Sequence, residues 1–171
     1  MLYCNKESTT MTYQYTEDLT VYVLVRTDLP SLSPAKAMAQ THHAATQMMS
    51  KHSNHPFVKG YIEYGIKQGA DHFNTTLIMA ATLPQLIDIH SNMLTLDLCC
   101  FDIVTDPTYP FVVDSEISNL LIETDTMKKV KVLDNGDVLW TRNEVTCAWF
   151  LIDRNYEAVK SFFKDLSLLR I

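Results

Sequence analysis

The chain has 171 residues, of which 47% are hydrophobic and 20% charged, a composition typical of a single soluble globular domain. Its four glycines are too few for a glycine-built phosphate loop, and its formal net charge of −6 means that only a local basic patch could hold a nucleic acid. No run approaches the roughly 18 apolar residues of a membrane-spanning helix, and the N-terminus lacks the residue order of a secretion signal. We therefore expect a cytoplasmic protein without a membrane partner.

The first third of the chain predicts a strand followed by two helices. Residues 1–17 are polar and without a period, so we expect a loosely held leader. Residues 19–25 form a nearly continuous apolar, β-branched run, which is typical of a central strand covered on both faces. Ser33 and Pro34 provide a capping hydroxyl and a proline for the first helical position. The helices expected after them span residues 35–51 and 57–67.

The remaining two thirds predict further strands and helices and one hairpin. Asn135 and Gly136 lie between two strand-like segments within residues 130–140, and this dipeptide is the strongest short-range hairpin signal in a sequence. The other strands are expected at residues 73–81, 96–104 and 145–152, and the other helices at residues 82–93 and 156–166.

Strands separated by helices imply crossover connections and a mixed or largely parallel sheet. We therefore predict an α/β fold: a three-layer domain over residues 18–171, with a mixed sheet of about four strands, helices on both faces and an inserted β-hairpin. The insert is expected at about residues 111–142.

Cysteine and histidine show no metal-ligand spacing. Cys99 and Cys100 are neighbours, and on a strand they would point to opposite faces, which suits neither a disulfide nor a shared metal. Several histidines lie close in sequence, but no cysteine or acidic residue completes a ligand set. We therefore expect reduced, mostly buried thiols, no metal and no cofactor. The residues concerned are Cys4, Cys99, Cys100, Cys147, His42, His43, His52 and His55.

The first helix carries a polar stripe of Lys36, Gln40, His43 and Gln47, whose spacing keeps all four on one face. One interpretation is a solvated face opposite a core face of alanine and methionine, including Met38 and Met48. The other is a binding site, because a lysine in the first turn after a strand lies where ligands bind in open α/β sheets, and its charge suits phosphate or a developing oxyanion.

Two stretches share a wider pattern. The first strand runs into Val25-Arg26-Thr27-Asp28-Leu29, and the helix begins Ala35-Lys36-Ala37-Met38-Ala39-Gln40-Thr41-His42-His43-Ala44. Together they resemble the opening signature of the archaeal and eukaryotic class of peptidyl-tRNA hydrolases, which is R-T-D-L and then G-K-x-A-A-Q-x-x-H-A. The likeness continues weakly at residues 106–110 and 144–146, and it covers residues 19–166 apart from the insert. Within that family, the sequence is most similar in its departures to the divergent members found in large tailed phages. A phage-encoded protein of this kind would act in the cytoplasm of the host.

The resemblance implies hydrolysis of the ester that joins a peptide or a blocked amino acid to the terminal ribose of tRNA. It places the catalytic residues at Lys36, Asp106 and Thr146, and it places substrate-binding residues at Gln40, His43 and Arg26. In such a site an aspartate orients or deprotonates a water, while lysine and threonine hydrogen-bond the carbonyl oxygen and the leaving hydroxyl. Without the resemblance, Asp106 would be a turn carboxylate and Thr146 an ordinary strand residue.

Several positions depart from the family pattern. The glycine before the lysine is Ala35, the loop before Lys36 is one residue longer, and Pro107 and Pro110 replace an alanine and a threonine of the loop. These departures keep open a catalytically silent binding module for tRNA or a protein partner. A purely structural interaction protein is a further alternative, with no positive feature in its favour, and the sequence leaves a homodimer open.

The basic cluster available for tRNA is Lys128, Lys129 and Lys131, in the predicted insert. One interpretation is a hairpin edge that lysines protect against strand pairing. The other is an arm whose lysines bind phosphates beside the site and so offset the acidic body locally.

Overall fold

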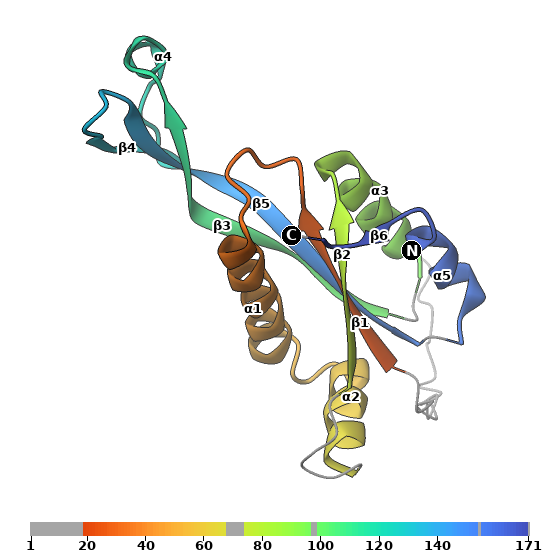
Figure 1. Cartoon of the computed structure of the whole chain (residues 1–171). Helices are drawn as coiled ribbons and strands as arrows, with labels where there is room; N and C mark the ends of the chain where they lie inside the picture. The colour runs from red at the N-terminus through yellow and green to blue at the C-terminus, as the bar shows by residue number, and fades with distance from the viewer. Residues whose placement is uncertain (1–18, 68–73, 97–98, 154, 171) are drawn as a thin grey trace, which may run out of the picture.

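The computed structural model describes residues 19–67, 74–96, 99–153 and 155–170, and these residues form an α/β fold around one mixed sheet (Figure 1). The sheet has six strands, two more than predicted. The strands are β1 (Leu19–Arg26), β2 (Thr75–Ala81), β3 (Cys99–Val113), β4 (Met127–Val132), β5 (Val138–Asp153) and β6 (Ser167–Leu168). The helices are α1 (Pro34–Lys51), α2 (Pro56–Lys67), α3 (Leu83–Met93), α4 (Ser115–Leu120) and α5 (Glu157–Phe163).

Strand β1 lies at the centre of the sheet, as its apolar sequence predicts. All eight of its residues are buried, and it pairs in parallel with β2 and antiparallel with β5. The strand order is β3-β5-β1-β2-β6, with β4 paired to β5 off this path. The mixed sheet is therefore confirmed, with antiparallel pairs on both sides of the parallel pair β1–β2.

Helices cover both faces of the sheet, as predicted (Figure 1). Val21, Val23 and Val25 of β1 pack in one buried layer with α1 and α2. Tyr22 and Leu24, which alternate with them, pack in the other layer with α3 and α5. The strand thus has no polar face because each of its two faces is covered by helices.

Local chain signals explain where α1 begins and where the hairpin turns. The Ser33 hydroxyl accepts a hydrogen bond from the Lys36 N–H (3.3 Å), and Pro34 fills the first helical position, so the predicted cap is confirmed. The hairpin between β4 and β5 turns at Gly136, whose φ of +89° is readily adopted only by glycine. Both signals act over a few residues, which is why the sequence alone reveals them.

Strands β3 and β5 are much longer than predicted. The segments expected at residues 96–104 and 145–152 are parts of strands of 15 and 16 residues, so the interpretation of residues 145–152 as a separate strand is wrong. Beyond the body of the sheet, β3 and β5 stay paired and carry α4 and β4 with them. We call residues 109–142 the arm, and Figure 1 shows it projecting from the body near the start of α1.

Cys99 packs in the layer with α3 and Cys100 in the layer with α1, so the two neighbours point to opposite faces as expected. Burial raises the pKa of the Cys100 and Cys147 thiols to about 12. None of the helices that the structure describes is both long and apolar enough to cross a membrane. The predicted leader and Cys4 lie outside the described residues.

Candidate functional site

Asp106 lies on an irregular stretch of β3, where the register against β5 shifts twice, first after Val104 and again between Asp106 and Tyr109. Its Oδ1 accepts hydrogen bonds from the Thr108 N–H (2.9 Å) and the Thr108 hydroxyl (3.1 Å). Its Oδ2 is 3.5 Å from the Gln40 side-chain nitrogen. Asp106 is therefore both a turn carboxylate, as its sequence context suggests, and part of a contact with α1.

Gln40 joins two of the predicted site residues. Its amide nitrogen faces Asp106, and its Oε1 accepts a hydrogen bond from the Thr146 hydroxyl. Gln40 is 4% exposed and Thr146 is fully buried. The interpretation of the polar stripe as a solvated face is thus wrong for Gln40, because β3 and β5 lie against this face of α1.

A second glutamine of the stripe is anchored in the same way. Gln47 accepts a hydrogen bond from the Trp149 indole (2.8 Å) and donates one to the Ile103 carbonyl (3.1 Å). His43, between the two glutamines, stays exposed. Gln40 and Gln47 therefore attach α1 to the long strands β3 and β5.

Lys36 lies one helical turn before Gln40 and is half-buried. Its Nζ is 5.0 Å from the centroid of the Tyr109 ring, a cation–π distance. The Tyr109 hydroxyl is hydrogen-bonded to Ser31 in the loop before α1 (2.8 Å). Tyr109 is therefore a site residue that sequence reasoning missed, although it stands in the segment 106–110 that was singled out.

Two hollows flank these residues. The smaller, about 350 Å³, is lined by His43, Asp106 and the loop around them. The larger, about 660 Å³, lies between the loop before α1 and the base of the arm, and Lys36 lines it. The structure thus brings Asp106 and Thr146 together through Gln40, while Lys36 opens to the neighbouring hollow.

Arg26, predicted to bind substrate, is only 6% exposed and is surrounded by acceptors. Its guanidinium forms a two-pronged ion pair with Asp28 (3.0 Å for both contacts), another with Glu144, and a hydrogen bond to the Val145 carbonyl (2.8 Å). The hydrogen bond from Arg26 lowers the pKa of the Asp28 carboxyl below its ordinary value. Arg26 therefore fixes the loop after β1 to β5 and is not available to a substrate.

Arg142, at the base of the arm, is a second residue that sequence reasoning missed. Its guanidinium pairs with Glu144 (2.5 Å) and lies 5.1 Å from the centroid of the Phe111 ring. Its place in the sequence could have indicated this role. Arg142 lies two residues before Glu144 on β5, and side chains two residues apart on a strand lie on the same face.

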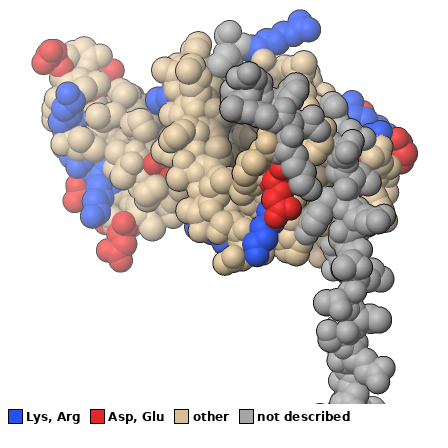
Figure 2. Space-filling view, turned by 90° about the horizontal axis from the view of Figure 1, so that it is seen from below, with Lys and Arg blue, Asp and Glu red and all other residues tan. Residues whose placement is uncertain are grey.

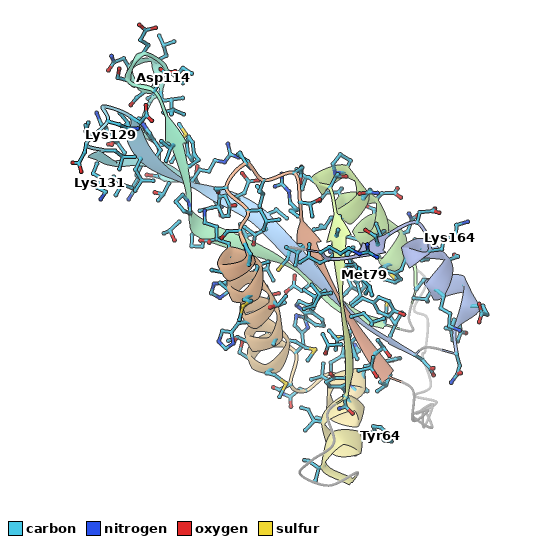
Figure 3. The ribbon with its side chains drawn as sticks, in the orientation of Figure 1. Tyr64, Met79, Asp114, Lys129, Lys131 and Lys164 are labelled. Carbon is cyan, nitrogen blue, oxygen red and sulfur yellow. The ribbon has the colours of Figure 1, made fainter. Side chains whose placement is uncertain are left out.

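The basic cluster lies on β4, with all three lysines exposed. Lys128 is opposite Thr141 and Lys131 is opposite Leu139, whereas Lys129 is opposite Trp140. Since side chains alternate along β5, Lys128 and Lys131 lie on one face of the arm and Lys129 on the other. Figure 3 shows Lys129 and Lys131 at the outer end of the arm, away from α1.

Acidic residues surround this cluster. Residues 111–142 contain six acidic side chains and four basic ones. In Figure 2 the positive and negative side chains of the arm are interspersed, so this view shows no continuous basic surface. Strand β4 is paired on one side by β5, and the lysines also fit a protected strand edge.

No group of three or more metal-ligating side chains is found among the residues that the structure describes. No protein-family model matches the chain, and no curated protein matches its sequence.

Proposed function

We propose that the protein hydrolyses the ester bond between a peptide, or an N-blocked amino acid, and the terminal ribose of tRNA, in the cytoplasm. The observation that carries the proposal is the position of Gln40. Its side chain contacts both Asp106 and Thr146, which are two of the three catalytic residues that the resemblance to peptidyl-tRNA hydrolases implies, and the third, Lys36, lies one helical turn before it.

Asp106 is the group that acts on water in this proposal. Thr108 holds its Oδ1, and Gln40 faces its Oδ2, so the carboxylate has a fixed orientation beside the smaller hollow. A water held by this carboxylate attacks the ester carbonyl, and Asp106 takes up the proton. The bond from the carbonyl carbon to the ribose oxygen then breaks, and the proton passes to the leaving hydroxyl.

Lys36 stabilises the oxyanion that forms on the carbonyl oxygen. The Tyr109 ring packs against its ammonium group and removes part of its freedom, which lowers the cost of placing the charge. Lys36 is half-buried, so its interaction with a developing negative charge is less screened than on an open surface.

Thr146 acts as a positioning residue in this proposal. Its hydroxyl is fully buried and donates a hydrogen bond to Gln40, so it orients the Gln40 side chain and does not contact the substrate in this proposal. Gln40 in turn places its amide against Asp106. Loss of the Thr146 hydroxyl would therefore affect catalysis through the orientation of Asp106.

The proposal is tested by incubating the protein with N-acetyl-aminoacyl-tRNA and measuring release of the N-acetyl amino acid. Wild type should release it, and the variants Lys36→Ala and Asp106→Asn should release far less. Lys59→Ala, which removes an exposed lysine on α2 remote from the site, is the matched control and should behave as wild type. Equal release by Lys36→Ala and wild type would refute the proposed role of Lys36.

The second candidate is a catalytically silent module that binds tRNA or a protein partner. The burial of Thr146 favours it, because a hydroxyl that cannot reach the substrate leaves one fewer donor for the reaction. Tight binding of N-acetyl-aminoacyl-tRNA without release of the amino acid would support this candidate over the hydrolase. Gel filtration with light scattering would show whether the protein acts as a homodimer.

A further inference from the structure

The larger hollow, between the loop before α1 and the arm, contributes Lys36 to the reaction proposed above, but its other lining residues have no role there. At about 660 Å³ it falls within the usual size of a ligand site. Pro30, Ser31 and Lys36 form one wall, and the arm supplies the remaining lining residues. We call this hollow the arm groove. The arm residues that line it are Pro110, Phe111, Val112, Val113, Leu139 and Arg142.

The arm groove combines an apolar floor with two cations. Phe111 carries the Arg142 guanidinium at 5.1 Å from its ring centroid, so a planar cation and an aromatic ring lie together on one wall. Lys36 lies on the other wall, with its Nζ at the Tyr109 ring. An apolar surface with cations on both sides suits a ligand that has a flat ring and a negative charge.

The charge balance leaves room for an anion. Glu144 pairs with both Arg26 and Arg142, and Asp28 pairs with Arg26. Among the described residues that line the groove, Lys36 and Arg142 are cationic and none is a carboxylate. The Arg142 side chain remains 40% exposed, and its Nε is buried without a hydrogen-bond partner among the described residues. An incoming phosphate would therefore meet a positive charge in excess.

We propose that the arm groove binds the single-stranded 3′ end of the tRNA, with a base stacked at Phe111 and a phosphate between Lys36 and Arg142. This inference rests on the proposed function, and it states which way round the tRNA ester lies in the site. The nucleotide side of the ester lies in the arm groove, and the acyl side lies in the smaller hollow beside His43 and Asp106. Aromatic rings and arginine planes are the usual platforms for single-stranded bases, and phosphates prefer guanidinium and ammonium groups.

An acyl group is the less suitable occupant of the arm groove. The side chain of a blocked amino acid varies and is mostly uncharged, so it would make no use of two cations. The smaller hollow adjoins Asp106, and no lysine or arginine is among the described residues that line it. Figure 3 places Lys129 and Lys131 at the outer end of the arm, so an acceptor stem held by these lysines would reach the groove along the arm.

The test measures RNA binding by fluorescence anisotropy, so that it does not depend on hydrolysis. The probes are an acceptor-stem RNA hairpin with a single-stranded CCA end and the same hairpin with a blunt end. Phe111→Leu keeps the apolar volume but removes the ring, and Arg142→Gln removes the charge. Tyr156→Leu and Arg170→Gln change an exposed aromatic residue and an exposed arginine elsewhere, and they serve as matched controls.

We expect Phe111→Leu to weaken binding of the CCA hairpin about 5- to 150-fold, which corresponds to about 1–3 kcal/mol of stacking per base. Binding of the blunt hairpin should not change, and neither control should alter either affinity. Arg142→Gln should also weaken binding of the CCA hairpin and flatten its salt dependence. Thermal melting of each variant shows that it is folded before binding is compared.

Failure of this inference differs from failure of the proposed function. If the protein hydrolyses N-acetyl-aminoacyl-tRNA but Phe111→Leu binds the CCA hairpin as wild type does, the assignment of the groove is wrong and the function stands. If Phe111→Leu instead changes the preference between large and small acyl groups, the groove holds the acyl side and the orientation is reversed. If hydrolysis is absent but the CCA end still requires Phe111, the groove assignment survives in a binding module.

Discussion

The Thr146 hydroxyl donates a hydrogen bond to Gln40, which lies 106 residues earlier in the chain. Neither side chain meets appreciable solvent, since Gln40 is 4% exposed and Thr146 fully buried. The bond runs from the interior of β5 to α1, and the amide nitrogen of the same Gln40 side chain faces Asp106. This one contact therefore couples the stability of the interior to the geometry of the proposed site.

Thr146→Val should destabilise the protein by about 1–3 kcal/mol, because the buried Oε1 of Gln40 loses its donor while the side-chain shape is kept. Thr20→Val is the matched control. Thr20 is also fully buried on a strand, but its hydroxyl has no partner among the described residues, so its removal should leave stability unchanged or increase it. Urea denaturation of both variants measures the difference, and equal destabilisation of the two would contradict the assigned bond.

Lys36→Ala should separate activity from stability. The ammonium group contacts the Tyr109 ring but forms no ion pair among the described residues, so its loss should cost less than about 1 kcal/mol of folding free energy. If Lys36 stabilises the oxyanion as proposed, its loss should lower kcat about 100- to 1000-fold. Thermal melting and single-turnover hydrolysis measure the two effects, and an unfolded Lys36→Ala variant would make Lys36 a structural residue.

Two methionines of α1 test which face of the helix is buried. Met48 is 5% exposed, but Met38, which was expected in the core, is 69% exposed, so that expectation is wrong. Met48→Asp should cost at least about 3 kcal/mol because it buries an unpaired charge. Met38→Asp should stay within about 0.5 kcal/mol of wild type. Chemical denaturation compares the two, and a large cost at position 38 would mean that α1 packs with a different face.

The lysines of β4 should contribute unequally to RNA binding. If they bind phosphates, each lost contact lowers the slope of log K against log salt by about 0.7–0.9. Lys128 and Lys131 share a face of the arm, so we expect their joint reversal to glutamate to produce most of the effect of the triple reversal. Lys129→Glu alone should change the slope little. A slope unchanged in the triple variant would leave these lysines with the role of protecting the edge of β4.

Asp28 should make stability depend on pH in acid. Its pKa is lowered in the folded protein, chiefly by the hydrogen bond from Arg26, so its stabilising contribution is complete above the unfolded pKa and is lost as pH falls through the folded pKa. Asp28→Asn should therefore be less stable than wild type at about pH 7, and the difference should shrink at an acid pH below the unfolded pKa of Asp28. Urea unfolding at both pH values tests this, and a constant difference would exclude Asp28 as the titrating group.

Local patterns in the sequence determined much of the fold. The apolar run of β1, the cap at Ser33 and the turn at Gly136 each depend on residues close in the chain, so their structure follows from their own chemistry. The grouping of Lys36, Asp106 and Thr146 came from the resemblance and stays a prediction, while the structure shows that Gln40 contacts Asp106 and Thr146.

Only the tertiary structure decided how the long strands run and which polar residues are buried. Residues 141–144 are Thr-Arg-Asn-Glu and resemble a break between strands, yet β5 continues through them because β3 supplies its hydrogen bonds there. Gln40 is buried and Met38 exposed because of what lies against each face of α1, and the period of a helix does not encode its neighbours. The arm groove has the same origin, since Lys36 and Arg142 meet across it only through the pairing of distant strands.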